Sequence, residues 1–166
     1  IAFPKEIFSL DWSATFAVMS VLSMTIGNLV AIRQENIKRL LAYSTVAHAG
    51  YMLMGLAAIV SRSSDTELNV GPSSVLFYVA GYAFTNLAAF TTVIAISNHI
   101  KSDMIDDFAG MARRAPYLAA VLAFSMISLI GLPPTVGFIT KVYIFGGAVD
   151  AHLGWLALAG VLNSTI

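Results

Sequence analysis

Residues 116–146, PYLAAVLAFSMISLIGLPPTVGFITKVYIFG, form an apolar run in which Lys141 is the single charged residue. A helix needs about 20 residues to cross the roughly 30 Å hydrocarbon core of a bilayer. Because backbone groups in lipid have to bond within their own segment, this run is predicted to be a transmembrane helix. Gly131, Pro133, Pro134 and Gly137 are expected to break it, since proline donates no N–H and clashes with the preceding helical turn.

Three more apolar runs precede this stretch and predict spans at 12–32, 37–60 and 73–98, in which Lys38 and Arg39, at the start of the second, are the only charged residues. The broken span at 116–146 follows them. A fifth span, 152–166, is expected to be truncated, so that the chain is a fragment of a longer protein. Of the 166 residues 58% are hydrophobic and 11% charged, whereas soluble domains carry about 25% charged residues. The predicted fold is therefore an all-α, polytopic transmembrane bundle of four to five spans.

Composition and motifs also exclude several classes of function. The formal net charge is zero, which gives no basic field for nucleic acid. The chain has no cysteine, so disulfides and Cys-ligated clusters are excluded. No phosphate-binding loop, dinucleotide fingerprint or zinc-protease motif is present, and the three scattered histidines do not predict a metal or haem site. We expect no cofactor in this chain.

The distribution of basic residues predicts an orientation. Six Lys and Arg residues fall on one side of the predicted spans, and two, Lys5 and Arg62, on the other. By the positive-inside rule the first side faces the cytoplasm. This places the loop 99–114 inside and the loop 61–72 outside, provided that the broken span crosses the membrane once. The six are Arg33, Lys38, Arg39, Lys101, Arg113 and Arg114.

Lys141 is the first candidate functional residue. A lysine at the centre of a membrane helix costs about 2.5–3.5 kcal/mol on insertion scales and usually faces protein or a hydrated path. Loss of hydration makes an ammonium easier to deprotonate, which suits a proton-exchanging group. The alternative is a lysine near a helix end that extends to the interface, because Asp150 and His152 follow closely.

The helix break before Lys141 favours the functional interpretation. A broken helix leaves carbonyls unpaired, which is tolerated at membrane depth where protein or cavity water satisfies them. Interrupted helices form ion sites in transporters. A plain proline kink is the alternative, and the nearby lysine makes it less favoured.

A second group of candidates lies in the span 37–60. Ser44, His48 and Tyr51 share one helical face, and Lys38 lies at the cytoplasmic start of the span. Histidine can pass protons near neutral pH. However, Lys38 fits a topological anchor equally well, and His48 fits a buried residue bonded to a carbonyl. Weaker candidates, explained as well by helix packing, are Tyr78, Tyr82, Thr85 and Asn86; polar groups at helix ends are expected at Asn28 and Asn98.

Three sequence blocks resemble the antiporter-like subunits of respiratory complex I. They are NIKRLLAYS at 36–44 followed by HAGY at 48–51, DDFAGMARRAP at 106–116, and GLPPTVGFITK at 131–141. L-type subunits tend to have Gln in place of His48, and M-type subunits tend to have Glu in place of Lys141. Lys141 followed by Val142 and Tyr143 is therefore similar to the N-type subunit, called chain 2 in mitochondria and plastids.

The resemblance implies a function for the whole chain. Residues 1–166 would form the C-terminal part of one proton-translocating membrane domain, with Lys141 as the terminal lysine of a proton half-channel and with Lys38 and His48 on the hydrated path. The protein would be a subunit of NADH–quinone oxidoreductase that couples quinone reduction to proton pumping. NADH, FMN, iron–sulfur clusters and quinone would bind elsewhere in the complex.

The expected partners are the other membrane subunits and the lipid bilayer, in a bacterial inner membrane, with no nucleic acid. Two alternatives remain at this point. The chain could belong to a multisubunit cation/proton antiporter, or it could be a membrane scaffold without proton traffic.

Overall fold

The computed structural model describes residues 11–61 and 70–166. Over these residues the structure is all-helical, apart from its loops and one isolated β-bridge, which confirms the predicted fold class. The longer helices are α1 (Trp12–Ile32), α2 (Ile37–Ser61), α3 (Val70–Ile100), α5 (Pro116–Ile130), α6 (Val136–Asp150) and α7 (Gly154–Ser164). Two short elements, η1 (Ile105–Phe108) and α4 (Met111–Arg114), lie between α3 and α5.

The first three long helices are apolar and long enough to cross a membrane. Helix α1 has the predicted bounds, and its first turn is capped by Asp11, whose Oδ1 accepts hydrogen bonds from the N–H groups of Ser13 and Ala14. Helix α2 ends one residue later than predicted, and α3 extends beyond 73–98 at both ends. The predicted loop 61–72 falls largely on residues 62–69, which lie outside the described residues.

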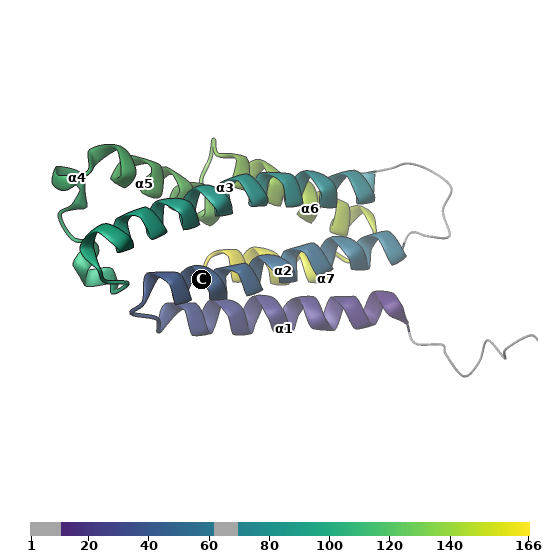
Figure 1. Ribbon diagram of the computed structural model, residues 1–166. Helices are drawn as coiled ribbons and strands as arrows, with labels where there is room; N and C mark the ends of the chain where they lie inside the picture. The colour runs from purple at the N-terminus through teal and green to yellow at the C-terminus, as the bar shows by residue number, and fades with distance from the viewer. Residues whose placement is uncertain (1–10, 62–69) are drawn as a thin grey trace, which may run out of the picture.

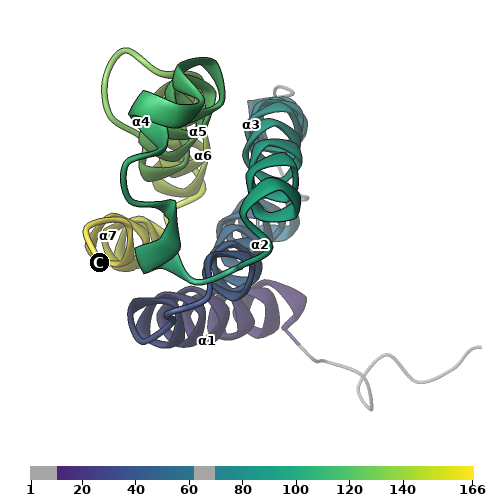
Figure 2. The same cartoon turned by 60° about the vertical axis from the view of Figure 1, so that its left-hand side comes forward.

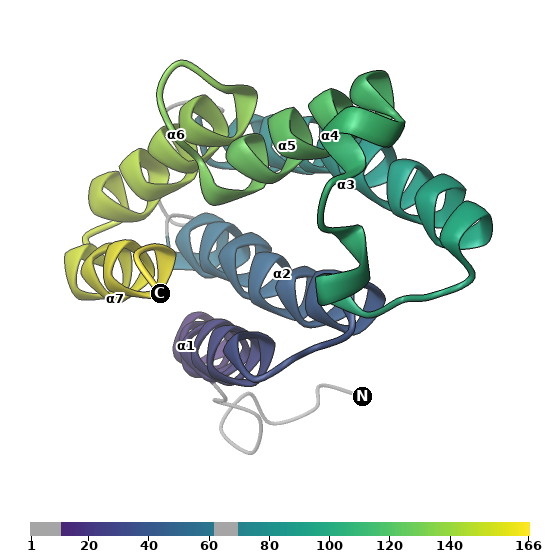
Figure 3. The ribbon, with the colours of Figure 1, turned by 90° about the vertical axis from the view of Figure 1, so that its left-hand side faces the viewer.

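The long helices run back and forth along one direction (Figure 1). Helix α1 packs along α2, and α3 packs on α2 and against both α5 and α6. Helix α7 returns beside α1, α2 and α6, as the turned views show (Figures 2 and 3). Large apolar side chains remain exposed on the outer faces, for example Leu22, Phe84 and Phe124. Such a surface suits contact with lipid or with other apolar subunits.

The predicted span 116–146 is two helices placed end to end. Near the end of α5, Leu129 packs in one cluster with Ala89 and Val93 in the later half of α3. Helix α6 packs instead near the start of α3, where Ile144 shares a cluster with Tyr78. Each helix has 15 residues, which gives a length of about 22 Å. Together α5 and α6 run once along the bundle (Figure 1), as the predicted single crossing requires.

The loops that carry the six predicted cytoplasmic cations lie at one end of the bundle. Asn36 and Met104 form an antiparallel bridge that joins the α1–α2 loop to the segment after α3. The prediction of a plain loop at 99–114 was wrong in part, because it contains η1 and α4. Gly110, with φ of 77°, occupies the left-handed region before α4, so that the chain can turn between the two short helices.

Candidate functional site

The break between α5 and α6 depends on two glycines. Gly131 ends α5 with φ of 87°, and the Ile127 carbonyl accepts hydrogen bonds from the N–H groups of Gly131 and Leu132. At Gly137 the first turn of α6 touches the last turn of α5. A Cβ there would lie 1.7 Å from the Ser128 carbonyl oxygen. Helix α6 can therefore begin at this position only with glycine at residue 137.

Lys141 is buried and reaches back across the break. Its side chain is 7% exposed, and Nζ donates hydrogen bonds to the Ile130 carbonyl (2.8 Å) and to Ser164 Oγ (3.0 Å). Ile130 is the last residue of α5, where carbonyls have no helical partner and the helix dipole is negative. Gly131 leaves room for the lysine, since a Cβ there would lie 3.1 Å from Lys141 Cδ. Lys141 therefore reaches into the bundle, between the end of α5 and the end of α7.

The ammonium of Lys141 has neutral groups around it. Its Nζ lies 5.4 Å from the centre of the Tyr51 ring, within the range of a cation–π contact. Among residues 11–61 and 70–166 the structure has one ion pair, and it joins Lys38 to Asp103 instead. Within the described part of the chain, the charge on Lys141 is thus offset by dipoles and not by a carboxylate.

His48 lies in an aromatic setting inside the bundle. Its Nδ1 lies 2.6 Å from the Tyr78 hydroxyl, and its ring stacks on Tyr82 with 4.6 Å between ring centres. Tyr51 presents its ring edgewise at 5.9 Å. His48 is therefore buried among protein groups, and its partner is a hydroxyl and not the carbonyl of the alternative interpretation. Two of the weaker candidates, Tyr78 and Tyr82, therefore contact His48 directly.

One cavity of about 390 Å³ joins the two candidate groups. Four of the five predicted path residues line it: Lys141, His48, Ser44 and Tyr51. The cavity lies between α1, α2, α5, α6 and α7. The helix break, the helix α2 that carries His48 and the C-terminal helix α7 therefore all contribute to its lining. A space of this size can hold several waters between the ammonium and the imidazole.

The contribution of α1 and α7 to this cavity was not predicted from the sequence. Asn28 lies near the end of α1, as expected, but it also joins α1 to α7, because its Nδ2 donates a 2.6 Å hydrogen bond to the backbone carbonyl of Asn163. Asn163 is buried, and its Oδ1 has no hydrogen-bond partner among the described residues. Ser164 holds Lys141. The available signal was the pair Asn163-Ser164 near the end of an otherwise apolar run.

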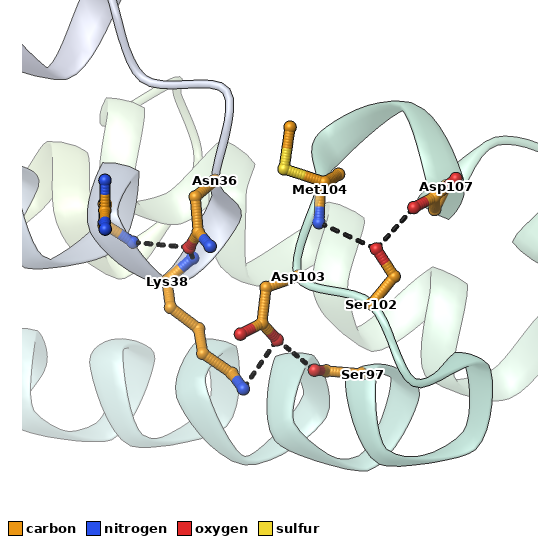
Figure 4. Close-up of polar contacts among 8 residues, drawn as sticks. Asn36, Lys38, Ser97, Ser102, Asp103, Met104 and Asp107 are labelled. Atoms are coloured by element: carbon orange, nitrogen blue, oxygen red, sulfur yellow. Dashed lines mark hydrogen bonds and ion pairs between the residues drawn. The ribbon is translucent and has the colours of Figure 1, made fainter.

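Lys38 lies apart from this cavity, at the end of the bundle that carries the loops (Figure 4). Its Nζ is 2.6 Å from Asp103 Oδ1, and Ser97 Oγ donates to the same oxygen. The Lys38 ammonium, followed by the Ser97 hydroxyl, holds the pKa of Asp103 below its usual range. Both members of the ion pair are about one-third exposed, with side chains 37% and 34% accessible. The place of Lys38 on a proton path stays a prediction.

Backbone contacts hold the same two loops together. The Ile37 N–H donates to the Asp103 carbonyl and the Ile105 N–H to the Glu35 carbonyl, both at 2.9 Å. The Asn36 side chain caps α2 by accepting from the N–H groups of Lys38 and Arg39 (Figure 4). We call this group, residues 35–39 with 97–107, the loop clasp. No set of three His, Cys, Asp or Glu side chains suitable for a metal occurs in the described part of the chain.

All 166 residues match the family described as NADH:quinone oxidoreductase/Mrp antiporter, transmembrane. The chain belongs to this family. One curated relative, NADH-quinone oxidoreductase subunit N of Trichlorobacter lovleyi, is 44% identical over 99% of this chain and 32% of its own length. The chain thus spans about a third of the length of the curated relatives it matches. The match to subunit N confirms the predicted resemblance to the N-type subunits.

Two solved structures of the family share the fold. Respiratory complex I from Thermus thermophilus contains a chain that is 30% identical, with a TM-score of 0.73, over 92% of this chain and 33% of that one. The Mrp complex from Dietzia contains a chain that is 25% identical, with a TM-score of 0.80, over 92% of this chain and 27% of that one. The family and its membrane location agree with the apolar helices described above.

Proposed function

We propose that this chain forms the C-terminal part of a proton-translocating membrane domain in an NADH–quinone oxidoreductase, and that Lys141 and His48 carry protons through it. The observation that carries this proposal is the buried ammonium of Lys141 at the broken helix. Among the described residues one freed carbonyl and one hydroxyl hold this charge, without a carboxylate. A charge held in this way gains or loses its proton more readily than a fixed ion pair. His48 borders the same cavity.

The relatives named NADH-quinone oxidoreductase subunit N support a proposal for the complex around this chain. We propose that the chain assembles with other membrane subunits in a bacterial inner membrane, with its exposed apolar faces against them and against lipid. NADH, FMN, iron–sulfur clusters and quinone would bind to other parts of that complex. The role of the chain would be to move protons in response to quinone reduction elsewhere.

A cation/proton antiporter is the second candidate, favoured by the likeness to the Mrp complex. The two candidates differ in what drives the protons. An antiporter would exchange cations for protons in vesicles without NADH, whereas the oxidoreductase would move protons only with NADH and quinone. The higher identity to subunit N supports the oxidoreductase.

The test replaces Lys141 in the full-length subunit within the intact complex. Lys141→Ala removes the proton carrier, and Lys141→Arg keeps a charge that can hardly lose its proton. We expect both variants to assemble, as judged by native gel electrophoresis, and both to show a lower rate of NADH-driven proton pumping in membrane vesicles. Normal pumping by both assembled variants would refute the role of Lys141.

A further inference from the structure

A buried hydrogen bond joins Tyr78 to His48 and limits which ring nitrogen of His48 can carry a proton. Tyr78 is 1% exposed and His48 is 7% exposed, and 2.6 Å separates the hydroxyl oxygen from Nδ1. Across the described residues, Nδ1 of His48 is the only hydrogen-bond partner of the Tyr78 hydroxyl. The direction of this one bond therefore decides where both residues hold their protons.

The hydrogen-bonding needs of the Tyr78 hydroxyl favour Tyr78 as the donor in this bond. A tyrosine hydroxyl carries one proton, and a buried hydroxyl that only accepted would leave that proton without a partner, which costs free energy. If the Tyr78 O–H donates, Nδ1 accepts with its lone pair and every group is satisfied. Neutral His48 then carries its proton on Nε2.

This assignment restricts what His48 can do in the cavity it shares with Lys141. With Nδ1 engaged by Tyr78, Nε2 is the ring nitrogen outside this bond, and His48 lines the cavity. A protonated Nε2 donates a hydrogen bond but has no lone pair with which to accept a proton. The other tautomer would accept there, but its Nδ1–H would donate to Tyr78, whose own proton would then need another acceptor.

We propose that Tyr78 is a positioning residue that holds neutral His48 as its Nε2–H tautomer and so prevents it from accepting a proton from the cavity while the Tyr78 hydroxyl bonds to Nδ1. The consequence for pumping rests on the proposed function, whereas the tautomer itself does not. Proton acceptance at Nε2 requires the Tyr78 hydroxyl to turn away first. Tyr78 then controls, through His48, when a proton from the cavity can be accepted, and we call this control the gate.

Tyr82 supplies a matched control on the same helix. Its ring stacks on His48, but its hydroxyl donates to Thr45 Oγ1 at 2.9 Å and not to the imidazole. Tyr78→Phe and Tyr82→Phe each remove one hydroxyl and keep a ring in place. A simple packing role for these tyrosines would make the two variants alike, whereas a tautomer role distinguishes them.

The experiment is ¹⁵N NMR on the intact complex labelled at histidine, with the His48 signals identified as those lost in His48→Gln. In the native protein we expect an unprotonated Nδ1 and one tautomer. In Tyr78→Phe the Nδ1–H form should rise about tenfold relative to the Nε2–H form, as the loss of one hydrogen bond allows. Tyr82→Phe should match the native protein. A protonated Nδ1 in the native protein, or an unchanged tautomer in Tyr78→Phe, would overturn the proposal.

Pumping by the same samples separates this proposal from the proposed function. We expect Tyr78→Phe to keep quinone reduction but to move fewer protons per electron than Tyr82→Phe. Mixed tautomers with native pumping in Tyr78→Phe would overturn the gate. If the NMR result is as expected but Lys141→Ala pumps normally, the tautomer assignment stands and the proposed function fails.

Discussion

Two lysines of this chain have opposite environments, although both lie on apolar helices. Lys38, at the start of α2, is about one-third exposed and forms an ion pair with Asp103 in the loop clasp. Lys141, in α6, is 7% exposed and is bound by a carbonyl and a hydroxyl. Membrane helices commonly place lysine at their ends to anchor them, and a lysine within the bilayer usually marks a functional path.

The comparison shows that the partners of a lysine, more than its presence, suggest its task. The charge of Lys38 is paired with the carboxylate of Asp103, 2.6 Å away. The neutral dipoles around Lys141 balance its charge less firmly, so a small change in nearby charge can alter its protonation. We therefore propose that Lys38 holds the loops together and that Lys141 exchanges protons.

The largest effect is expected from adding a side chain at Gly137, where α6 touches α5. Gly137→Ala would place a methyl group 1.7 Å from the Ser128 carbonyl oxygen, so α5 and α6 must separate. Overpacking against backbone should cost about 3 kcal/mol or more, seen as lost assembly or a lower unfolding temperature of the complex. Gly146→Ala is the control, because a Cβ there meets nothing within 4 Å. Equal behaviour of the two variants would contradict the account of the break.

A smaller effect is expected from removing one partner of Lys141. Ser164→Ala leaves the Ile130 carbonyl as the one remaining hydrogen-bond acceptor of the buried ammonium among the described residues. Loss of a hydrogen bond to a charged group should destabilise the protein by about 1.5–3 kcal/mol, measured by thermal denaturation of the complex. The control is Thr165→Val, because the exposed Thr165 hydroxyl bonds to Leu162 in its own helix. A Ser164→Ala protein as stable as the control would show that this contact is unimportant.

Removing the ion pair of the loop clasp should reduce stability by a smaller amount, and this loss of stability should depend on pH and salt. Because its pKa lies below the usual value, Asp103 stabilises the folded state above the ordinary carboxyl pKa, and this contribution is lost as pH falls through the lowered value. Asp103→Asn should therefore be less stable than the native protein by a constant amount between about pH 5 and 8. The difference should shrink below about pH 4 and in high salt.

Thermal denaturation over this pH range tests the clasp, with Asp106→Asn as the control on a neighbouring exposed carboxylate. A difference that grows as the pH falls would contradict the sign of the Asp103 contribution.

The orientation of the bundle can be tested without disturbing either lysine. The chain has no cysteine, so single cysteines at Asp106 and at His152 report on the two ends of the bundle. We expect an impermeant thiol reagent to label position 106 from the cytoplasmic side and position 152 from the opposite side, with no change in activity. Labelling with the reverse pattern would place the loop clasp outside.

The transmembrane spans and the helix break could be predicted because the lipid environment strongly limits where charged residues can occur in the sequence. Charges at Asp11 and Arg33 mark the bounds of α1, since a charged side chain is costly in the hydrocarbon core. Pro133, Pro134 and their neighbouring glycines mark the break, because proline removes a hydrogen bond wherever it occurs. The candidate residues of α2 were found together because helical spacing places them on one face.

Pairings between distant helices were not predictable. The contacts of Asn28 with Asn163 and of His48 with Tyr78 join residues 135 and 30 positions apart. Helical periodicity shows which side chains share a face, but it does not show which helix that face will meet. The two short helices before α5 were missed because they have 4 residues each, which is too short for helical periodicity to show in the sequence.

The ratio of protons pumped to electrons transferred tests the central claim most directly. It should be measured in vesicles that contain equal amounts of assembled complex carrying Lys141→Ala or Lys38→Ala. The account predicts a lower ratio in Lys141→Ala and a native ratio in Lys38→Ala. A native ratio in Lys141→Ala, or an equal loss in both variants, would contradict the division of tasks between the two lysines.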